Sequence, residues 1–295
     1  MSFDYNIRGW LKKINEPSGS DPIFGMELYY ESGTSDNRWN GNIARQTWKG
    51  KDNVARRYDY KYDKANRLKW ANFTPGTSEN YNYTVGEIYY DGNGNIQAMH
   101  RNNQRTASSY GYVDFLEYEY ESAYSNRLKQ VKDTYTSTTY TAEDFVERST
   151  TAYGYDDNGN QTSNLDKQIS SISYNHLNLP ETVTFTGNIG KIVFHYDAEG
   201  NKLKQEVYTG STLDKTTDYI GEYVFEDGSL DYLLQEEGRV AYESGNYQYE
   251  YFIKDHLGNV RQVVRAPIGT TMMATMEMAS APEEEQEFEQ VEESR

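Results

Sequence analysis

The chain has 295 residues, a formal net charge of −17 and no cysteine. Without cysteine it has no disulfide framework and no thiolate metal site, and the acidic excess argues against general nucleic-acid binding, which needs a basic surface. Since no run of about 18 apolar residues occurs, the sequence predicts no membrane span.

Tyrosine dominates the apolar composition. The chain contains 29 tyrosines, and aliphatic and aromatic residues together make up 36% of it. Tyrosine has a flat apolar body and a hydroxyl that can stay hydrated, so a tyrosine-rich sheet can face a water-filled space. Short runs rich in Val, Ile, Thr, Tyr and Phe favour strands, and helical periodicity is weak, so the sequence predicts an all-β protein.

One short pattern recurs along the chain: an aromatic residue, any residue, Tyr, then Asp or Asn, two further residues, and Gly or Asn. Along the chain, the first copy is a loose one and the last copy is distinctive. Clear copies lie at residues 60–68, 89–96, 153–160, 194–203 and 251–260, and looser ones at 5–11, 39–43, 118–128 and 172–179.

Each copy predicts a β-hairpin. The Tyr-x-Tyr step alternates as a strand does, the Asp side chain can accept a hydrogen bond from the backbone two residues later, and Gly three positions on can take a positive φ. The second strand then leaves in the opposite direction. The residues assigned to these structural turns are Asp63, Asp91, Gly94, Asp156, Gly159, Asp197, Gly200, Asp255 and Gly258.

Tandem hairpins are too small to be stable alone, so they are expected to stack into one long antiparallel sheet. The chief alternative is an irregular β-propeller, which also repeats hairpins but needs a regular period of about 40 to 50 residues. The turn anchors at positions 63, 91, 121, 156, 175 and 197 lie 19 to 35 residues apart, which favours the continuous sheet.

Three longer motifs resemble the rearrangement-hotspot (RHS) or YD-repeat family, in the form with an RHS repeat-associated core seen in Bacteroidetes-like bacteria. They are Asp4–Leu11 (DYNIRGWL), Tyr174–Pro180 (YNHLNLP) and Lys254–Arg261 (KDHLGNVR). The resemblance covers residues 4–265. It implies that the sheet coils into a spiral and forms part of a hollow shell, which encloses a C-terminal toxin until delivery.

The resemblance also implies a role and a location. We expect a non-catalytic structural or encapsulation segment of a bacterial RHS polymorphic toxin or cell-surface protein, secreted or surface-located as part of a longer chain. Its partners are then the rest of its own RHS polypeptide and an encapsulated C-terminal toxin domain. Met1-Ser2-Phe3 does not open a signal peptide, and the family's self-cleavage motif does not follow Arg261, so we expect a fragment or truncated member, enough for part of a spiral.

Two regions are expected. Residues 1–265 form the repeat sheet, and residues 266–295 form an acidic tail rich in Met and Glu, disordered or weakly helical.

The candidate chemistry is sparse, and no catalytic, cofactor-binding or metal-binding residue is predicted. His100, His176, His195 and His256 have no metal-ligand spacing. Residues 91–95 and 156–160 open like calcium loops but lack the later Gly and Glu of such loops. The alternative function is a carbohydrate- or cell-surface-binding module, in which exposed tyrosines together with Trp10, Trp39, Trp48 and Trp70 stack on surface glycans.

Overall fold

In a computed structural model the chain is described over residues 2–16, 23–33, 36–135, 145–243 and 245–265. The segment expected to form the acidic tail, residues 266–295, lies outside the described residues. Among those described, no helix has the length and apolar character needed to cross a membrane.

The described residues form β-strands and one short 3₁₀ helix, Thr186–Asn188. In chain order the strands are β1 (Phe3–Tyr5), β2 (Leu11–Ile14), β3 (Gly25–Tyr29), β4 (Arg45–Lys49), β5 (Arg56–Tyr62), β6 (Leu68–Thr74), β7 (Tyr89–Tyr90), β8 (Ile96–Thr106), β9 (Ser109–Tyr120), β10 (Leu128–Asp133) and β11 (Gly154–Tyr155). They continue with β12 (Gln161–Ser163), β13 (Ile169–Tyr174), β14 (Pro180–Phe185), β15 (Gly190–Tyr196), β16 (Lys202–Thr209), β17 (Thr212–Ile220), β18 (Tyr223–Glu226), β19 (Ser229–Gln235), β20 (Gly238–Glu243), β21 (Asn246–Lys254) and β22 (Val260–Arg265).

The strands pair in the order in which they occur. Among the described residues, strands β1–β6, β7–β10, β11–β12 and β13–β22 form four antiparallel sheets. Within each sheet every strand pairs with its neighbours in the sequence. Isolated bridges connect the first sheet to the second, where Val85 pairs with both Ala71 and Arg101, and the third to the fourth, where Asn164 pairs with Ile169. This is the expected all-β series of tandem hairpins. The consecutive order, running through ten strands in the last ladder, differs from the four-stranded blades of a propeller.

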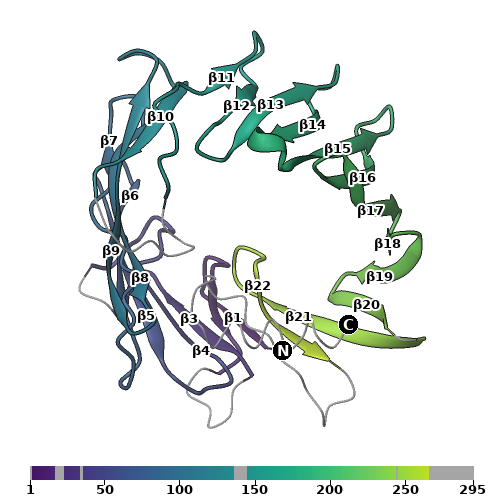
Figure 1. Ribbon diagram of the computed structural model, residues 1–295. Coiled ribbons are helices and arrows are strands. Elements are labelled where there is room, and N and C mark those ends of the chain that lie inside the picture. The colour runs from purple at the N-terminus through teal and green to yellow at the C-terminus, as the bar shows by residue number, and fades with distance from the viewer. Residues whose placement is uncertain (1, 17–22, 34–35, 136–144, 244, 266–295) are drawn as a thin grey trace.

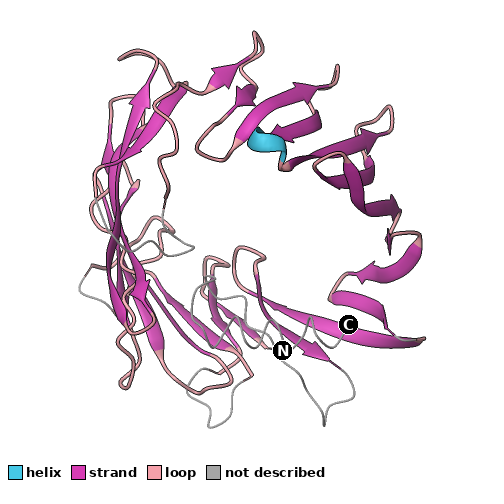
Figure 2. Cartoon of the chain, viewed as in Figure 1, coloured by secondary structure: helices cyan, strands magenta, loops and turns pink. Residues whose placement is uncertain are grey.

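The sheet coils into a ring. Figure 1 shows the strands following one another round the ring, and no described strand crosses its middle. The hairpin of β21 and β22 returns to the starting sheet, beside β1 and β3, and Figure 2 shows that the wall consists almost entirely of strands. The sequence predicted part of a spiral, and the structure has a sheet that curves far enough for its two ends to meet.

The larger core lies where the ends meet. It contains Ile14 of β2, Met26 of β3 and Phe24, which lies directly before β3, together with Ile253 of β21. Aromatic side chains pack against one another across neighbouring strands of the first sheet. Trp48 stacks on Tyr58 with centroids 5.7 Å apart, and Tyr58 packs against Phe73 at 5.2 Å. Aromatic cross-strand pairs of this kind stabilise a sheet directly, so the tyrosine-rich composition supplies a real core here.

The four tryptophans do not share one environment. Trp48 is buried in the core, and Trp10 packs against Tyr30 with ring centroids 5.2 Å apart. Trp39 and Trp70 are exposed. Sheet packing therefore accounts for Trp10 and Trp48, and glycan binding stays a prediction.

Candidate functional site

The turns of the repeat share one hydrogen-bond geometry. In the turn after β7, Oδ1 of Asp91 accepts the backbone N–H groups of Asn93 (2.9 Å) and Asn95 (2.8 Å), and Oδ2 accepts the Asn95 amide at 2.9 Å. The Gly94 N–H donates to the Asp91 carbonyl at 3.2 Å, and Gly94 has a φ of +94°. One carboxylate thus organises the whole reversal, because it satisfies three donors that the turn directs away from the ladder.

The other assigned turn residues lie in equivalent places. Asp63, Asp156, Asp197 and Asp255 each accept the N–H groups two and four residues later. Gly159, Gly200 and Gly258 have positive φ, as does Asn66 in the turn of Asp63. The turn residues of two looser copies, Asn6 and Asn175, accept the same pair of bonds. The structure spreads these residues along the ring, one turn for each copy of the repeat, and does not gather them into one centre.

The turn carboxylates carry a pH dependence. Backbone and side-chain hydrogen bonds lower the pKa of Asp63, Asp91, Asp156 and Asp197 below the ordinary value of 3.8, although solvent reaches all four. A carboxyl with a depressed folded pKa stabilises the fold above its unfolded pKa and loses that contribution as pH falls through the folded value.

We therefore expect the thermal midpoint of Asp197→Ala to fall below that of the parent at pH 7, and the difference to shrink below pH 3.8. Asp197→Asn keeps an acceptor oxygen for the two backbone donors, so it should lie between the parent and the alanine variant. Thermal melts followed by circular dichroism between pH 2 and 7 check this. A difference that stays constant across the range would contradict the role given to the carboxylate.

A second interaction recurs between copies of the repeat and joins a hairpin to the copy before it. Tyr90, directly before Asp91, donates its hydroxyl to the backbone carbonyl of Leu68 at 2.6 Å. The acceptor is the residue that opens the outgoing strand of the preceding hairpin, five residues after Asp63. We call such a bond a tyrosine staple. The described residues contain seven staples, 2.5 to 3.0 Å long: Tyr30–Leu11, Tyr62–Ile43, Tyr90–Leu68, Tyr120–Ile96, Tyr155–Leu128, Tyr174–Gln161 and Tyr196–Pro180.

The staples explain why tyrosine precedes the turn acid, which sequence reasoning missed. From the sequence pattern, the tyrosines are expected to face water on one side of the sheet. The acceptor carbonyl belongs to the preceding copy, so a single copy of the pattern does not contain both the donor and the acceptor. A signal was present, since an apolar residue often stands five positions after the turn residue. Asparagine side chains add contacts between turns: the Asn95 amide donates to Oδ1 of Asn126 at 3.0 Å.

Tyr90→Phe removes the hydroxyl group of one staple and keeps the aromatic side chain. We expect this variant to lower the free energy of unfolding by about 1 kcal/mol. The matched control is Tyr124→Phe, because Tyr124 is 92% exposed and takes no part in a staple. Urea titrations of both variants measure the difference. Equal midpoints for the two variants would mean that the staple contributes nothing.

The last hairpin closes the ring with a different set of contacts. The guanidinium of Arg261, on β22, lies 5.9 Å from the ring centre of Phe24 and 6.0 Å from that of Trp48. Its Nη1 atom lies 3.9 Å from Oδ2 of the turn residue Asp255. Ile253 is buried in the core of the first sheet. The most distinctive sequence motif, residues 254–261, therefore contacts the other end of the chain.

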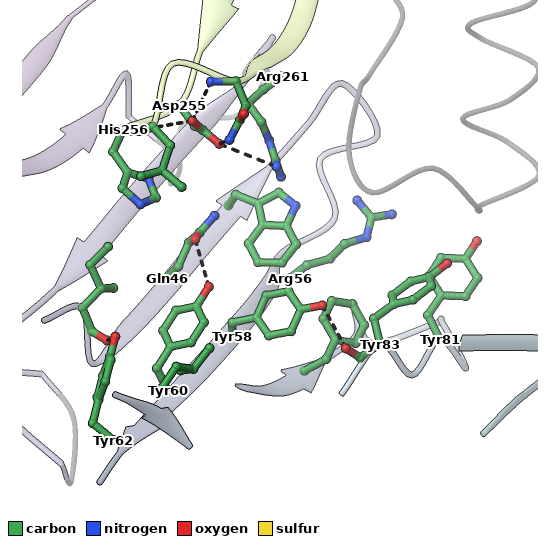
Figure 3. A pocket seen from close by; sticks show the side chains of 16 residues that line it. Gln46, Arg56, Tyr58, Tyr60, Tyr62, Tyr81, Tyr83, Asp255, His256 and Arg261 are labelled. Atoms are coloured by element: carbon green, nitrogen blue, oxygen red, sulfur yellow. Dashed lines mark hydrogen bonds and ion pairs between the residues drawn. The ribbon is translucent and has the colours of Figure 1, made fainter. Parts of the chain in front are cut away.

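A pocket of about 350 Å³ lies between this hairpin and the first sheet. Figure 3 shows Asp255, His256 and Arg261 on one side, facing Gln46, Tyr58 and Tyr60 on the other. The Tyr60 hydroxyl donates to Oε1 of Gln46 at 3.1 Å. Burial lowers the pKa of His256, while Asp255 opposes this shift and Arg261 reinforces it.

Several polar groups that line the pocket are paired within the first sheet and the segment that follows it. Arg56 is paired with Asp52 at 2.6 Å and with Glu79, and the Tyr58 hydroxyl donates to the Tyr83 carbonyl at 3.0 Å. Within the described ranges, no group of three or more His, Asp or Glu could hold a metal ion. The arrangement suits a packing contact between two ends of a sheet, and we assign no reaction to it.

Comparison with known proteins finds similarity in structure alone. No family model and no curated protein matches the sequence. Among solved structures, the crystal structures of TcdB2–TccC3–TEV and TcdB2–TccC3–Cdc42 match with TM-scores of 0.54 and 0.56, and a Tc holotoxin pore of Photorhabdus luminescens matches with 0.56. Each match covers 90% of this chain at 13% identity, and 15% of the other chain. This chain shares the fold of a short part of those toxin proteins.

Proposed function

We propose that the chain is a section of the wall of an encapsulating shell, which houses an effector segment of the same bacterial polypeptide and is itself non-catalytic. The observation that carries this is the closure of the ring: a sheet of tandem hairpins curves until β21 and β22 pack on the sheet that begins it. The likeness in fold to TcdB2–TccC3 assemblies supports a toxin-related role.

The chemistry of the wall supports a structural role. Turn carboxylates bind their own backbone, and tyrosine hydroxyls bind the neighbouring hairpin, so the repeated polar groups are used to hold the sheet in shape. Catalysis needs one constellation of groups around one substrate, whereas these groups recur at intervals round the ring.

The experiment is limited proteolysis of the longer polypeptide in which this sequence is expected to occur. The effector segment should resist protease in the parent and become cleavable in Ile253→Asp, which places a charge in the ring-closing core. Ile220→Asp is the matched control, because Ile220 is exposed. Equal cleavage of the effector segment in the parent and in Ile253→Asp would overturn the proposal.

A further inference from the structure

The pocket in the ring-closing contact has a wall of aromatic side chains. The rings of Tyr58 and Tyr60 stack with their centroids 5.8 Å apart, and those of Tyr81 and Tyr83 lie 6.1 Å apart. Figure 3 shows these four rings in a row, opposite the turn of the closing hairpin. Aromatic faces favour a planar apolar ligand, and a volume of about 350 Å³ lies at the lower end of the range for small-molecule sites.

Two buried nitrogen atoms of the pocket residues have no hydrogen-bond partner among the described residues. Nε1 of Trp48 is a donor on a side chain that is 4% exposed, and Nδ1 of His256 belongs to the opposite wall. A buried polar atom that lacks a partner costs free energy. A ligand that accepts the indole N–H removes this cost, so the pocket favours a ligand with an acceptor group.

The charge of Arg261 favours an acceptor that is an anion. Its Nη1 atom lies 3.9 Å from Asp255, farther than a hydrogen bond, and a guanidinium has five N–H donors, so it can bind a second anion. The same guanidinium lies 6.0 Å from the ring centre of Trp48. Burial raises the pKa of Tyr60, and Arg261 opposes this rise more strongly than Asp255 adds to it. Of the two charges, that of Arg261 therefore has the larger influence at the aromatic wall.

A cationic ligand is the alternative, since aromatic faces also attract cations. Among the lining residues that the structure describes, Asp255 is the acid, and its carboxylate serves its own turn. It accepts the N–H groups of Leu257 at 2.9 Å and Asn259 at 3.0 Å, and the Asn259 amide at 3.2 Å. The pocket therefore offers a guanidinium to an anion more readily than a carboxylate to a cation.

We propose that the pocket binds a planar aromatic carboxylate of one or two rings. The ring system lies against Tyr58 and Tyr60. The carboxylate accepts hydrogen bonds from Arg261 and from Nε1 of Trp48. Because the walls come from the closing hairpin and from the other end of the sheet, the ligand binds the closed ring alone and stabilises closure. The site depends on ring closure and not on what the shell encloses.

The test compares three probes that share one ring system: 2-naphthoate, 2-naphthylmethanol and 2-naphthylmethylammonium. In isothermal titration calorimetry with the full chain at pH 7, 2-naphthoate should bind about tenfold more tightly than the neutral alcohol, because it makes charge-assisted hydrogen bonds. The ammonium should bind most weakly. Any other order of affinities would overturn the proposal, and so would a lack of saturation at millimolar 2-naphthoate.

Two variants of the full chain test the part played by the guanidinium. Arg261→Gln should bind 2-naphthoate and the alcohol equally, whereas Arg127→Gln should keep the parent's preference for 2-naphthoate. Arg127 is the matched control because its guanidinium also lies over an aromatic ring, 5.3 Å from that of Tyr155, but outside the pocket. A preference in Arg261→Gln as large as in the parent would overturn the proposal.

Hydrogen exchange of the parent locates the site without any substitution. Saturating 2-naphthoate should slow the exchange of amides in β21 and β22 and in β4 and β5, and should leave β15 and β16 unchanged. This measurement and the probe series decide the matter even where Arg261→Gln detaches the closing hairpin, since both use the parent. Equal slowing along the whole sheet, or no slowing at β21 and β22, would place the ligand elsewhere and overturn the proposal.

Discussion

Replacing Glu250 by alanine is expected to cost about 3 to 5 kcal/mol of unfolding free energy, a larger loss than removing one tyrosine staple. Glu250 is 1% exposed and lies at the centre of a buried charge network. Its carboxylate binds Nε of Arg239, and Nε and Nη2 of Arg265 at 2.9 and 2.6 Å. Arg265 also donates to Oε1 of Glu243 at 2.6 Å.

The cost arises from the arginines that remain. Removing the central carboxylate leaves Arg239 without its acid and Arg265 with Glu243 alone, and both side chains are largely shielded from water. A buried charge that loses its partner is far more costly than an exposed one. Glu226→Ala is the control, because Glu226 forms an exposed pair with Lys215 and should cost no more than about 1 kcal/mol. Urea unfolding measures both, and equal costs would contradict the role of the network.

The network also makes the stability of the fold depend on pH under acidic conditions. Burial opposes the charge of Glu250, but Arg239 and Arg265 outweigh it and lower the pKa below the ordinary 4.5. The sign follows from linkage: the contribution is full above pH 4.5 and is lost as pH falls through the folded pKa. The side chain of Glu250→Gln cannot titrate. The difference in unfolding free energy between the parent and this variant should therefore become smaller below pH 4.5.

Ile253→Ala is expected to open the ring. Ile253 lies on β21 and is buried in the core of the first sheet. Its truncation therefore removes packing where the last hairpin meets the first strands. Large-to-small substitutions in a core cost about 2 to 4 kcal/mol. The lost stability should concern the contact between the last hairpin and the first sheet. We therefore expect β21 and β22 to detach from the first sheet, while strands β13–β18 stay paired.

Hydrogen exchange with residue-level readout checks this expectation. Amides of β21 and β22 should exchange faster in Ile253→Ala, and amides of β15 and β16 should keep the parent rates. Ile220→Ala is the matched control, because Ile220 is 62% exposed on β17 and should change neither set. Uniform acceleration along the whole sheet would show that Ile253 supports global stability and not closure.

Sequence reasoning predicted the antiparallel fold of tandem hairpins, because the turns that join the strands are local. The turn bonds of Asp91 reach two and four residues along the chain, and the positive φ of Gly94 lies three residues away, so one copy of the pattern contains the whole turn. The antiparallel order of strands follows, because short turns join sequence neighbours.

It failed where partners come from different copies. The Tyr90 hydroxyl meets a carbonyl of the preceding hairpin, and Arg261 meets Phe24 and Trp48 at the other end of the sequence. Such contacts depend on the accumulated curvature of the sheet, which no single hairpin specifies. The distinctive motif at residues 254–261 marked the closing hairpin, yet its sequence alone did not identify the surface it packs against.

The most direct test of the ring uses the absence of cysteine in the chain. Nε2 of Gln262 lies 3.3 Å from the position that a Cβ on Gly50 would occupy. A Gly50→Cys/Gln262→Cys variant, folded as judged by circular dichroism and treated with a short thiol-to-thiol cross-linker, should form an intramolecular link that closes most of the chain into a loop. Gly50→Cys/Leu213→Cys, whose second thiol lies on β17 away from the closing contact, should not. Efficient linkage in the first pair alone is the result expected of a closed ring, and equal or absent linkage in both pairs would contradict it.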